Sequence, residues 1–353
     1  MGRRVVVGMS GGVDSSAAAL MLHRDGWEVI GVTLHLWDYA REGHKGRCCA
    51  PEDQLDAARV CASLGVAHYT FDRRALFREK VVDRFVEDYA AGRTPSPCVR
   101  CNESVKIGPL WEIASRLGAE AVATGHYARV SVDGDGIDLR AGADGSKDQS
   151  YFLWAAPLDA LRRLQLPLGG MVKPEVRALA ASAGLANAQK PDSVDLCFLE
   201  GEAYAAFVAR QGGAPARPGN VETVTGEVVG RHQGVHAFTP GQRRGIGAAG
   251  APRYVLRVVP ERAAVVVGYD AQSRRSDATL VGFRWLGGAR PERVRARIRY
   301  RHDGVGARVE PAADGGARLW FDEPQRGVAP GQAAVLYDGE RVVGGGWITE
   351  VPS

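Results

Sequence analysis

The sequence predicts a mixed α/β protein in which a parallel-sheet domain precedes a small central domain and a C-terminal antiparallel β-barrel. Two patterns carry this prediction. Early in the chain, short apolar strands alternate with helical segments, which is typical of a parallel sheet covered on both faces. From about residue 255, only short alternating strands between glycine-rich turns remain, as in a small barrel. A length of 353 residues suits two or three domains, and we expect them at 1–200, 201–260 and 261–353.

Each element follows from its local pattern. Apolar runs predict strands over 4–8, 28–36, 67–71 and 121–124, and helical periodicity predicts helices over 14–24, 52–64, 76–91 and 104–117. A hairpin is expected over 130–141, and further helices over 174–183 and 204–211. The C-terminal strands are expected over 254–259, 263–267, 278–283, 294–300, 317–321, 333–337 and 342–348.

The turn after the first expected strand is the most informative segment. Ser10-Gly11-Gly12-Val13-Asp14-Ser15 joins a valine strand to an alanine-rich helix. Such a turn aims backbone N–H groups and a helix N-terminus at one point, which suits a phosphate or pyrophosphate. Asp14 could organise a metal ion or cap the helix. The spacing fits neither a Walker A loop nor GxGxxG. It resembles the PP-loop of enzymes that split ATP into AMP and pyrophosphate; the alternative is an ordinary capped glycine turn.

Composition narrows the class of protein. The chain is 45% hydrophobic and 24% charged, so it can bury cores and is not a globally disordered protein. A net charge of +4 permits an acidic partner without demanding one. Neither a signal peptide nor an apolar run of about 20 residues is recognisable, so we expect a soluble, cytoplasmic protein. Its six cysteines are then reactive, metal-binding or buried rather than a disulfide framework.

Three cysteines stand in informative surroundings. Cys98 and Cys101 form a CxxC in a proline-bounded segment, which we expect to be a presented loop. Arg100 and the nearby Arg93 and Lys106 would lower a thiol pKa there. A redox pair, half a metal site and sulfur chemistry all remain open. Cys197 alone would more often be a buried hydrophobe, but the polar entry at 190–193 favours a loop.

Arginine recurs at every second position over 293–301. On one strand these five side chains share a face, and their mutual repulsion favours a nucleic-acid backbone as the partner, with a solvated barrel face as the alternative. His126 is either functional or a satisfied strand-end histidine. Lys147-Asp148-Gln149-Ser150 is either functional or a solvated turn before an aromatic core segment.

Together the motifs resemble the tRNA-specific 2-thiouridylase family over nearly the whole chain. They are GMSGGVDSS at 8–16, AGRTPSPCVRCN at 91–102, ATGHYAR at 123–129, SKDQSYFLW at 146–154, KPDSVDLCF at 190–198, GRHQGVHAFTPGQRRGIG at 230–247 and FDEPQRGVAPGQAAVLYDG at 321–339. The PP-loop alone would identify only a superfamily. The ordered set, with cysteines in two distant segments, is far more specific.

The resemblance implies ATP- and Mg²⁺-dependent thiolation at C2 of the wobble uridine (position 34) of tRNA. Cys197 would carry persulfide sulfur delivered by a cysteine desulfurase or a sulfur-relay protein, and Cys101 would be its partner and nucleophile. By position, ATP would lie against Gly8, Met9, Ser10, Gly11, Gly12, Val13, Asp14, Ser15, Leu34 and Gly125. tRNA would contact Ser96, Pro97, Cys98, His126, Lys147, Asp148, Gln149, Arg299, Tyr300 and Gln332.

One position departs from the family pattern. Many members carry Asp, the proposed acid/base, where this chain has Cys98. An alternative therefore stays open in which Cys98, Cys101 and Cys197 ligate a [4Fe–4S] cluster, as in related thiolases. The competing functions are another PP-loop tRNA-modifying adenylase or ligase, and a non-catalytic RNA-binding or redox-sensing protein.

Overall fold

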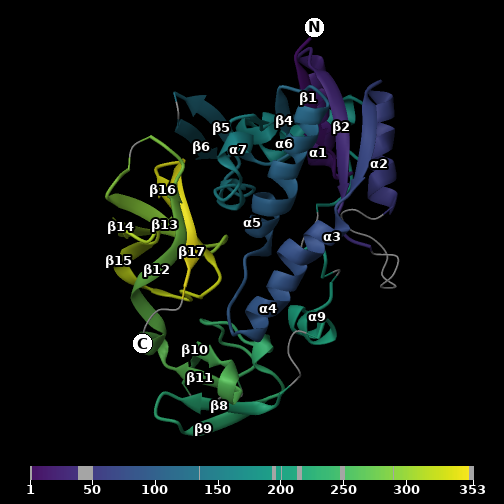
Figure 1. Ribbon diagram of the computed structural model, residues 1–353. Coiled ribbons are helices and arrows are strands. Elements are labelled where there is room, and N and C mark those ends of the chain that lie inside the picture. Colours follow the sequence, from purple (N-terminus) through teal and green to yellow (C-terminus); the bar gives the residue numbers. More distant parts are fainter. Residues whose placement is uncertain are drawn as a thin grey trace.

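The structure, a computed structural model, describes residues 2–38, 51–134, 136–192, 196–199, 201–212, 217–246, 251–288 and 290–349. It has the predicted α/β class: an N-terminal parallel-sheet domain, a small central unit and a C-terminal barrel that lies beside the N-terminal domain (Figure 1). None of the described helices combines the length and the apolar character that a membrane-spanning helix requires.

The N-terminal sheet has the strand order β3-β2-β1-β4-β7 and is parallel throughout. Its strands are β1 (Arg4–Gly8), β2 (Glu28–His35), β3 (Ala67–Asp72), β4 (Ala121–Ala123) and β7 (Leu164–Gln165). In β1, Val5 and Val7 face one hydrophobic cluster and Val6 faces another, and all three are fully buried. Such a strand needs cover on both faces, and the carboxyl ends of β1 and β4 then meet at one edge of the sheet.

Helices supply that cover. α1 (Val13–Arg24), α2 (Pro51–Ser63) and α8 (Lys173–Ser182) pack on the side of Val5 and Val7. α6 (Ile107–Arg116) and α4 (Arg84–Ala90) pack on the side of Val6. The helix expected over 76–91 is continuous but irregular, because the π-helical turn η2 (Arg78–Asp83) separates α3 (Arg74–Phe77) from α4.

The central unit is a four-stranded sheet with the order β10-β11-β8-β9. Its strands are β8 (Gly219–Thr223), β9 (Val228–His232), β10 (Tyr254–Val259) and β11 (Ala264–Gly268), and α9 (Tyr204–Arg210) precedes them. β10 and β11 pair directly in antiparallel register. The boundary expected near residue 260 therefore falls inside this hairpin.

The C-terminal sheet closes on itself. Its strands run in the order β12-β15-β14-β13-β16-β17, and β12 also pairs with β17. They are β12 (Arg274–Trp285), β13 (Arg293–Arg297), β14 (Val305–Pro311), β15 (Ala317–Arg326), β16 (Ala333–Asp338) and β17 (Arg341–Ile348). The expected hairpin is present as β5 (Ala128–Asp133) and β6 (Gly136–Ala141), and β6 extends the barrel sheet along β17.

The predicted row of five arginines on one strand face is wrong. β13 ends at Arg297, and the chain then bends and turns. The Arg297 guanidinium donates to the carbonyl oxygens of Tyr300 and His302, with 3.1 Å from Nε to the latter. This side chain therefore closes the turn that takes Arg299 and Arg301 off the strand.

Candidate active site

The loop between β1 and α1 adopts a conformation that its glycines make possible. Gly11 has φ +74°, and a Cβ there would lie 2.2 Å from the carbonyl oxygen of Asp53. Ser15 Oγ donates to the Gly12 carbonyl at 3.1 Å and accepts from the Ser10 N–H at 3.2 Å. The tight turn leaves the start of α1 facing the carboxyl edge of the sheet, where an anion is stabilised by N–H groups and the helix dipole.

Gly125 brings the end of β4 onto this loop. A Cβ at Gly125 would lie 2.6 Å from the backbone carbon of Asp14. The neighbouring His126 hydrogen-bonds Thr124 Oγ1 through Nδ1 at 2.8 Å. Burial, with a smaller effect from the charge of Lys106, lowers the pKa of His126 to about 3. Gly125 therefore acts by allowing close backbone approach, and His126 is neutral near pH 7.

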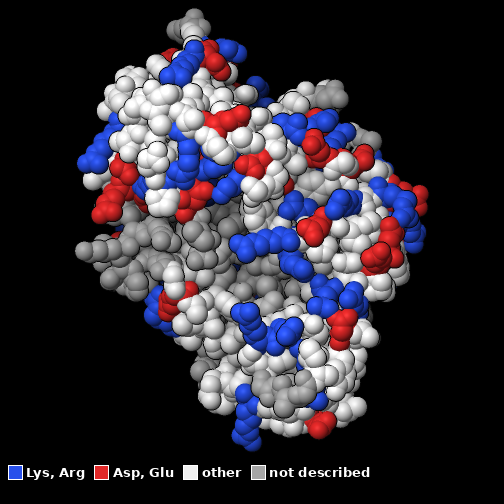
Figure 2. Space-filling view, turned by 180° about the vertical axis from the view of Figure 1, so that it is seen from behind, with Lys and Arg blue, Asp and Glu red and all other residues white. Residues whose placement is uncertain are grey.

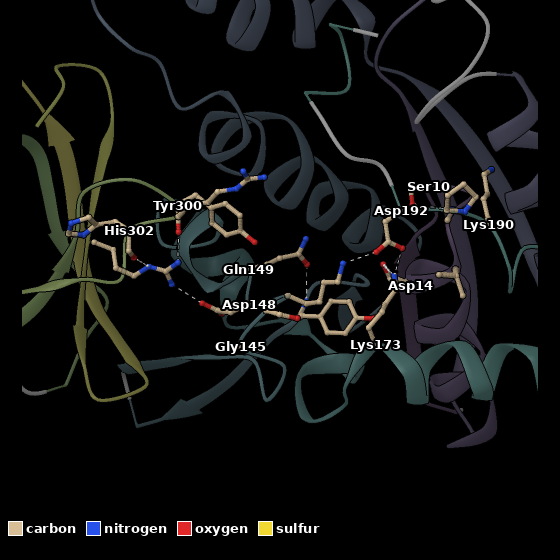
Figure 3. A pocket seen from close by; sticks show the side chains of 18 of the residues that line it. Ser10, Asp14, Gly145, Asp148, Gln149, Lys173, Lys190, Asp192, Tyr300 and His302 are labelled. Carbon is tan, nitrogen blue, oxygen red and sulfur yellow. Dashed lines mark hydrogen bonds and ion pairs between the residues drawn. The ribbon is translucent and has the colours of Figure 1, made fainter. Parts of the chain in front are cut away.

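A cavity of about 900 Å³ opens between this loop and the barrel. Figure 3 shows its side chains coming from the N-terminal domain on one side and the barrel turn around Tyr300 on the other. Of the residues predicted to hold ATP or tRNA, those that line it are Ser10, Gly12, Val13, Asp14, Lys147, Asp148, Gln149 and Tyr300. The remaining predicted residues do not line it: Gly8, Met9, Gly11, Ser15, Leu34, Gly125, Ser96, Pro97, Cys98, Cys101, His126, Cys197, Arg299 and Gln332.

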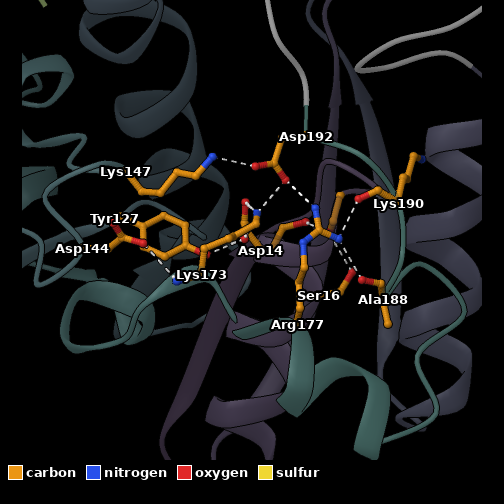
Figure 4. A network of polar contacts seen from close by, with 12 residues as sticks. Asp14, Ser16, Tyr127, Asp144, Lys147, Lys173, Arg177, Ala188, Lys190 and Asp192 are labelled. Atoms are coloured by element: carbon orange, nitrogen blue, oxygen red, sulfur yellow. Dashed lines mark hydrogen bonds and ion pairs between the residues drawn. The ribbon is translucent and has the colours of Figure 1, made fainter. Parts of the chain in front are cut away.

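Alternating charges line the floor of the cavity. The Lys173 ammonium donates to both carboxylate oxygens of Asp14, at 2.7 and 2.8 Å, and to Asp192 at 2.8 Å (Figure 4). Asp192 also pairs with Lys147 and Arg177, each at 2.8 Å. Burial opposes ionisation, but the hydrogen bonds from Lys147 and Lys173 hold the pKa of Asp192 at about 2. Cations suited to phosphates and a carboxylate suited to Mg²⁺ thus lie together at the start of α1.

Sequence reasoning missed Lys173. This lysine is the first residue of α8 and is buried, with 8% of its surface exposed. No motif surrounds it, and its contact with Asp14 spans 159 positions. The sequence signals Asp192 only through the polar character of residues 190–193, which predicts a loop before Cys197 and no contact with Asp14.

A second set of contacts holds the loop from behind. Asn187 Nδ2 donates to the Gly11 carbonyl at 3.0 Å and to Ser16 Oγ at 2.8 Å. The Lys190 ammonium donates to Gly11 O at 3.3 Å and pairs with Asp53. The side chains of Asn187 and Lys190 therefore attach the segment before Cys197 to the glycine loop over 10–15.

The expected CxxC loop is instead a short helix, α5 (Pro97–Cys101). Cys98 is exposed, but Cys101 is only 5% exposed, and burial raises the pKa of its thiol to about 11. Arg100 does not lower that pKa: its guanidinium pairs with Glu103 at 2.9 Å and lies over the ring of Trp347. The predicted presentation therefore holds for Cys98 and is wrong for Cys101. Of the basic residues expected to lower a thiol pKa, Lys106 does so for Cys101, but burial raises that pKa by more.

Cys101 belongs to the large hydrophobic cluster between the N-terminal sheet and the barrel, and the half-buried Cys197 packs against the same cluster. Cys48, Cys49 and residues 193–195 lie outside the described residues. Within the described part of the chain, no three His, Cys, Asp or Glu side chains are grouped to hold a metal ion. Cys98, Cys101 and Cys197 thus do not fit the ligand set of an iron–sulfur cluster.

Several residues expected at tRNA are engaged within the protein. Asp148 is 6% exposed and accepts from the N–H groups of Gly142 and Ser150 and from Arg297, the last at 3.0 Å. Gln332 Nε2 donates to the carbonyls of Thr94 and Pro95. The side chain of Arg299 is exposed. On the face shown in Figure 2, Lys and Arg side chains border the hollow at its middle.

Family models cover most of the chain. Residues 3–201 match the tRNA methyl transferase HUP domain, 206–269 the tRNA methyl transferase PRC-barrel domain, and 276–348 the aminomethyltransferase beta-barrel domain. Among solved structures, a 4-thiouridine synthetase–RNA complex with bound ATP covers 60% of this chain and 50% of that chain, at 16% identity. Its TM-score of 0.41 is too low to carry an argument.

Curated relatives match over nearly their whole length. A protein of Sorangium cellulosum named tRNA-specific 2-thiouridylase MnmA is 50% identical, covering 98% of this chain and 92% of its own. A Rhizorhabdus wittichii protein of the same name is 49% identical with the same coverage. Identity at this level extends through all three units, so this chain belongs to the family of tRNA-specific 2-thiouridylases.

Proposed function

We propose that this protein uses ATP to replace the C2 oxygen of a tRNA wobble uridine with sulfur, and so acts as a tRNA-uridine 2-sulfurtransferase. One observation carries the proposal. A single cavity is bordered both by the glycine loop at the start of α1 and by the Lys147–Gln149 and Tyr300 segments expected at tRNA. A nucleotide on the first wall and a base on the second would meet inside it.

The first step joins uridine to the nucleotide. The C2 oxygen attacks the α-phosphorus of ATP, the bond to the β-phosphate bridging oxygen breaks, and pyrophosphate leaves. The N–H groups at the start of α1 and the ammonium groups of Lys173 and Lys147 are suited to the charge that develops on the departing phosphates. Asp14 would hold the Mg²⁺ that accompanies ATP, giving up its contact with Lys173.

The second step introduces sulfur. The terminal sulfur of a persulfide on Cys197, supplied by a cysteine desulfurase or a sulfur-relay protein, attacks C2, and AMP leaves with the former C2 oxygen. Because neither Cys197 nor Cys101 lines the cavity, this step requires the segments that carry them to approach the base when RNA is bound. The Cys101 thiolate then attacks Cys197 Sγ, which releases 2-thiouridine and leaves a Cys101–Cys197 disulfide for an external thiol to reduce. Alternatively, the Cys101 thiolate attacks Cys197 Sγ of the persulfide first and releases hydrosulfide. The hydrosulfide then attacks C2, and the products are the same: 2-thiouridine, AMP and the Cys101–Cys197 disulfide.

The buried target base must leave the anticodon stack to reach this cavity. Single-stranded loops allow such splaying, and an aromatic ring can receive the base. The half-buried Tyr300, with its ring 4.3 Å from that of Phe152, offers that surface at the barrel wall. We assign the central unit and the remaining barrel face to binding of the tRNA body.

Mass spectrometry of tRNA nucleosides tests the proposal. Protein, ATP, Mg²⁺, a persulfide source and unmodified tRNA should yield 2-thiouridine, AMP and pyrophosphate in equal amounts. Cys101→Ala and Cys197→Ala should each lower thiolation by roughly 10⁴-fold while tRNA binding changes little, because each removes a reacting sulfur. Cys48→Ala and Cys49→Ala, at cysteines outside the predicted site, are the controls and should do much less.

The outcomes separate the competing functions. Pyrophosphate without thiolated nucleoside would indicate another adenylating enzyme or a ligase. RNA binding without pyrophosphate would indicate a non-catalytic RNA-binding protein. Normal thiolation by the Cys197→Ala protein would eliminate the persulfide assignment.

A further inference from the structure

The helix that carries Cys98 and Cys101 is held by the C-terminal barrel. The segment before it, residues 94–96, lies against the barrel loop 329–332. Thr94 N–H donates to the Pro330 carbonyl at 2.7 Å. Gln332 Nε2 donates back to the carbonyls of Thr94 and Pro95, at 3.1 and 2.8 Å. Three hydrogen bonds thus join the two loops across more than 230 positions of sequence.

The barrel loop approaches the segment before α5 closely at Gly331. Gly331 has φ +91°, and a Cβ there would lie 2.9 Å from the Thr94 carbonyl oxygen. The loop is itself fixed to β17, because Gly331 N–H donates to the Ile348 carbonyl and Ile348 N–H donates to the Gln332 carbonyl, both at 2.8 Å. The segment before α5 therefore rests on an ordered part of the barrel.

A second contact holds the helix itself. The Arg100 guanidinium lies 3.4 Å from the ring centroid of Trp347 in β17, and Glu103 holds its other side. Trp347 is 7% exposed, whereas the Arg100 side chain is 39% exposed, so the contact is a partly solvated cation–π pair of modest strength. Trp347 precedes Ile348, whose backbone hydrogen-bonds Gly331 and Gln332, so the two contacts come from adjoining parts of the barrel.

We propose that Gln332 and Trp347 are positioning residues that fix the Cys98–Cys101 helix and keep Cys101 buried. The barrel then contributes to the thiol site as well as to RNA binding. The inference rests on the proposed function only for the role of Cys101. The contacts exist without RNA, so they should protect Cys101 from alkylation without RNA as well.

Thiol alkylation in the absence of RNA tests this inference. Full-length protein is treated with iodoacetamide, and the rates at Cys101 and Cys61 are followed by peptide mass spectrometry. Cys61 is the matched control: it is fully buried in the N-terminal domain, and burial raises its thiol pKa to about 11, as for Cys101. Gln332→Glu keeps the size of the side chain but removes both donated hydrogen bonds.

Gln332→Glu and Trp347→Leu should each raise alkylation at Cys101 by about tenfold and leave Cys61 unchanged, because local opening costs less once these contacts are lost. Trp347→Phe, which keeps an aromatic face, should restore most of the protection. An unchanged Cys101 rate in both variants would overturn the inference, even if tRNA affinity fell. Equal increases at Cys101 and Cys61 would also overturn it, because the contacts would then serve only global stability.

These results are independent of the thiolation assay. A selective rise at Cys101 would stand even if no 2-thiouridine were formed. Conversely, active enzyme with an unchanged Cys101 rate would retain the proposed function and lose the positioning role.

Discussion

The two reactive regions of this protein are held in place in different ways. The loop over 10–15 is fixed by its own domain: Asn187, Lys190 and Lys173 contact it directly, and Gly125 packs against it. The helix over 97–101 is fixed by another domain, through Gln332 and Trp347 of the barrel. Substitutions in the barrel should therefore leave the conformation of the loop over 10–15 unchanged but disturb the helix over 97–101.

Asp14→Asn gives the largest effect expected from this comparison. Asparagine keeps the size of the side chain but loses the charge that pairs with Lys173 and attracts Mg²⁺. Pyrophosphate release should fall by about 10²- to 10³-fold, a loss typical of removing one electrostatic contact to a reacting group. The measurement is tRNA-dependent pyrophosphate formation at saturating ATP.

The same variant separates the two regions. Lys173 keeps Asp192 as a partner, so the domain should remain folded, and Cys101 alkylation should match the wild type. Asp192→Asn serves as the control for loss of a carboxylate in the same network. Undiminished pyrophosphate release by Asp14→Asn would contradict the placement of ATP on this loop.

A smaller effect is expected at the barrel turn. Arg299 is exposed and suited to a phosphate, whereas Arg297 is tied to Asp148 and to the turn. Arg299→Ala should weaken tRNA binding by roughly threefold and reduce the log–log salt slope by slightly under one unit. Arg297→Ala should act by releasing the turn, so the double variant should resemble Arg297→Ala alone.

Binding titrations at several salt concentrations check this. A slope reduced by about two units in the double variant would mean that both guanidiniums contact phosphates, contrary to the observed bonding of Arg297. Arg308→Ala, elsewhere on the barrel sheet, is the control for a general loss of positive charge.

The smallest effect concerns acid stability on the nucleotide side. The pKa of His126 is about 3 in the folded protein, against about 6.5 in an unfolded chain. The unfolded state therefore binds the proton first, so the contribution of His126 is complete above pH 6.5 and is lost as the pH falls toward 3.

His126→Gln should consequently reduce the fall in the thermal unfolding midpoint between pH 7.5 and pH 5 by ~2–4 °C. Thermal shift measurements without tRNA are sufficient. The exposed His23, changed to Gln, provides the comparison. If both variants lose stability in acid as the wild type does, His126 is not a source of the pH dependence.

The comparison also explains what the sequence could predict. The strands over 4–8 and 254–259 match β1 and β10 end to end, because each is a local apolar run. β8, β9 and β14 were missed because most of their residues are polar, small or only partly buried. The period-2 pattern at 293–301 failed where the side chain of Arg297 bonds back to the backbone.

The thiol helix shows the same limit. Pro95 and Pro97 suggested a loop, but proline is favoured in the first turn of a helix, where Pro97 lies. Burial of Cys101 depends on distant elements that no local pattern reveals. The nucleotide loop was predictable because its glycines and serines act on their own neighbours, whereas Lys173 reaches Asp14 only in the folded chain.

The burial of Cys101 has a consequence for how long the enzyme can hold its sulfur. Burial raises the pKa of the Cys101 thiol to about 11, so the protonated form predominates at pH 7. Under the proposed reaction, a persulfide on Cys197 would then face a protonated Cys101, which is a poor nucleophile. The enzyme that carries the persulfide would therefore persist between encounters with tRNA, and little sulfur would be lost without reaching uridine.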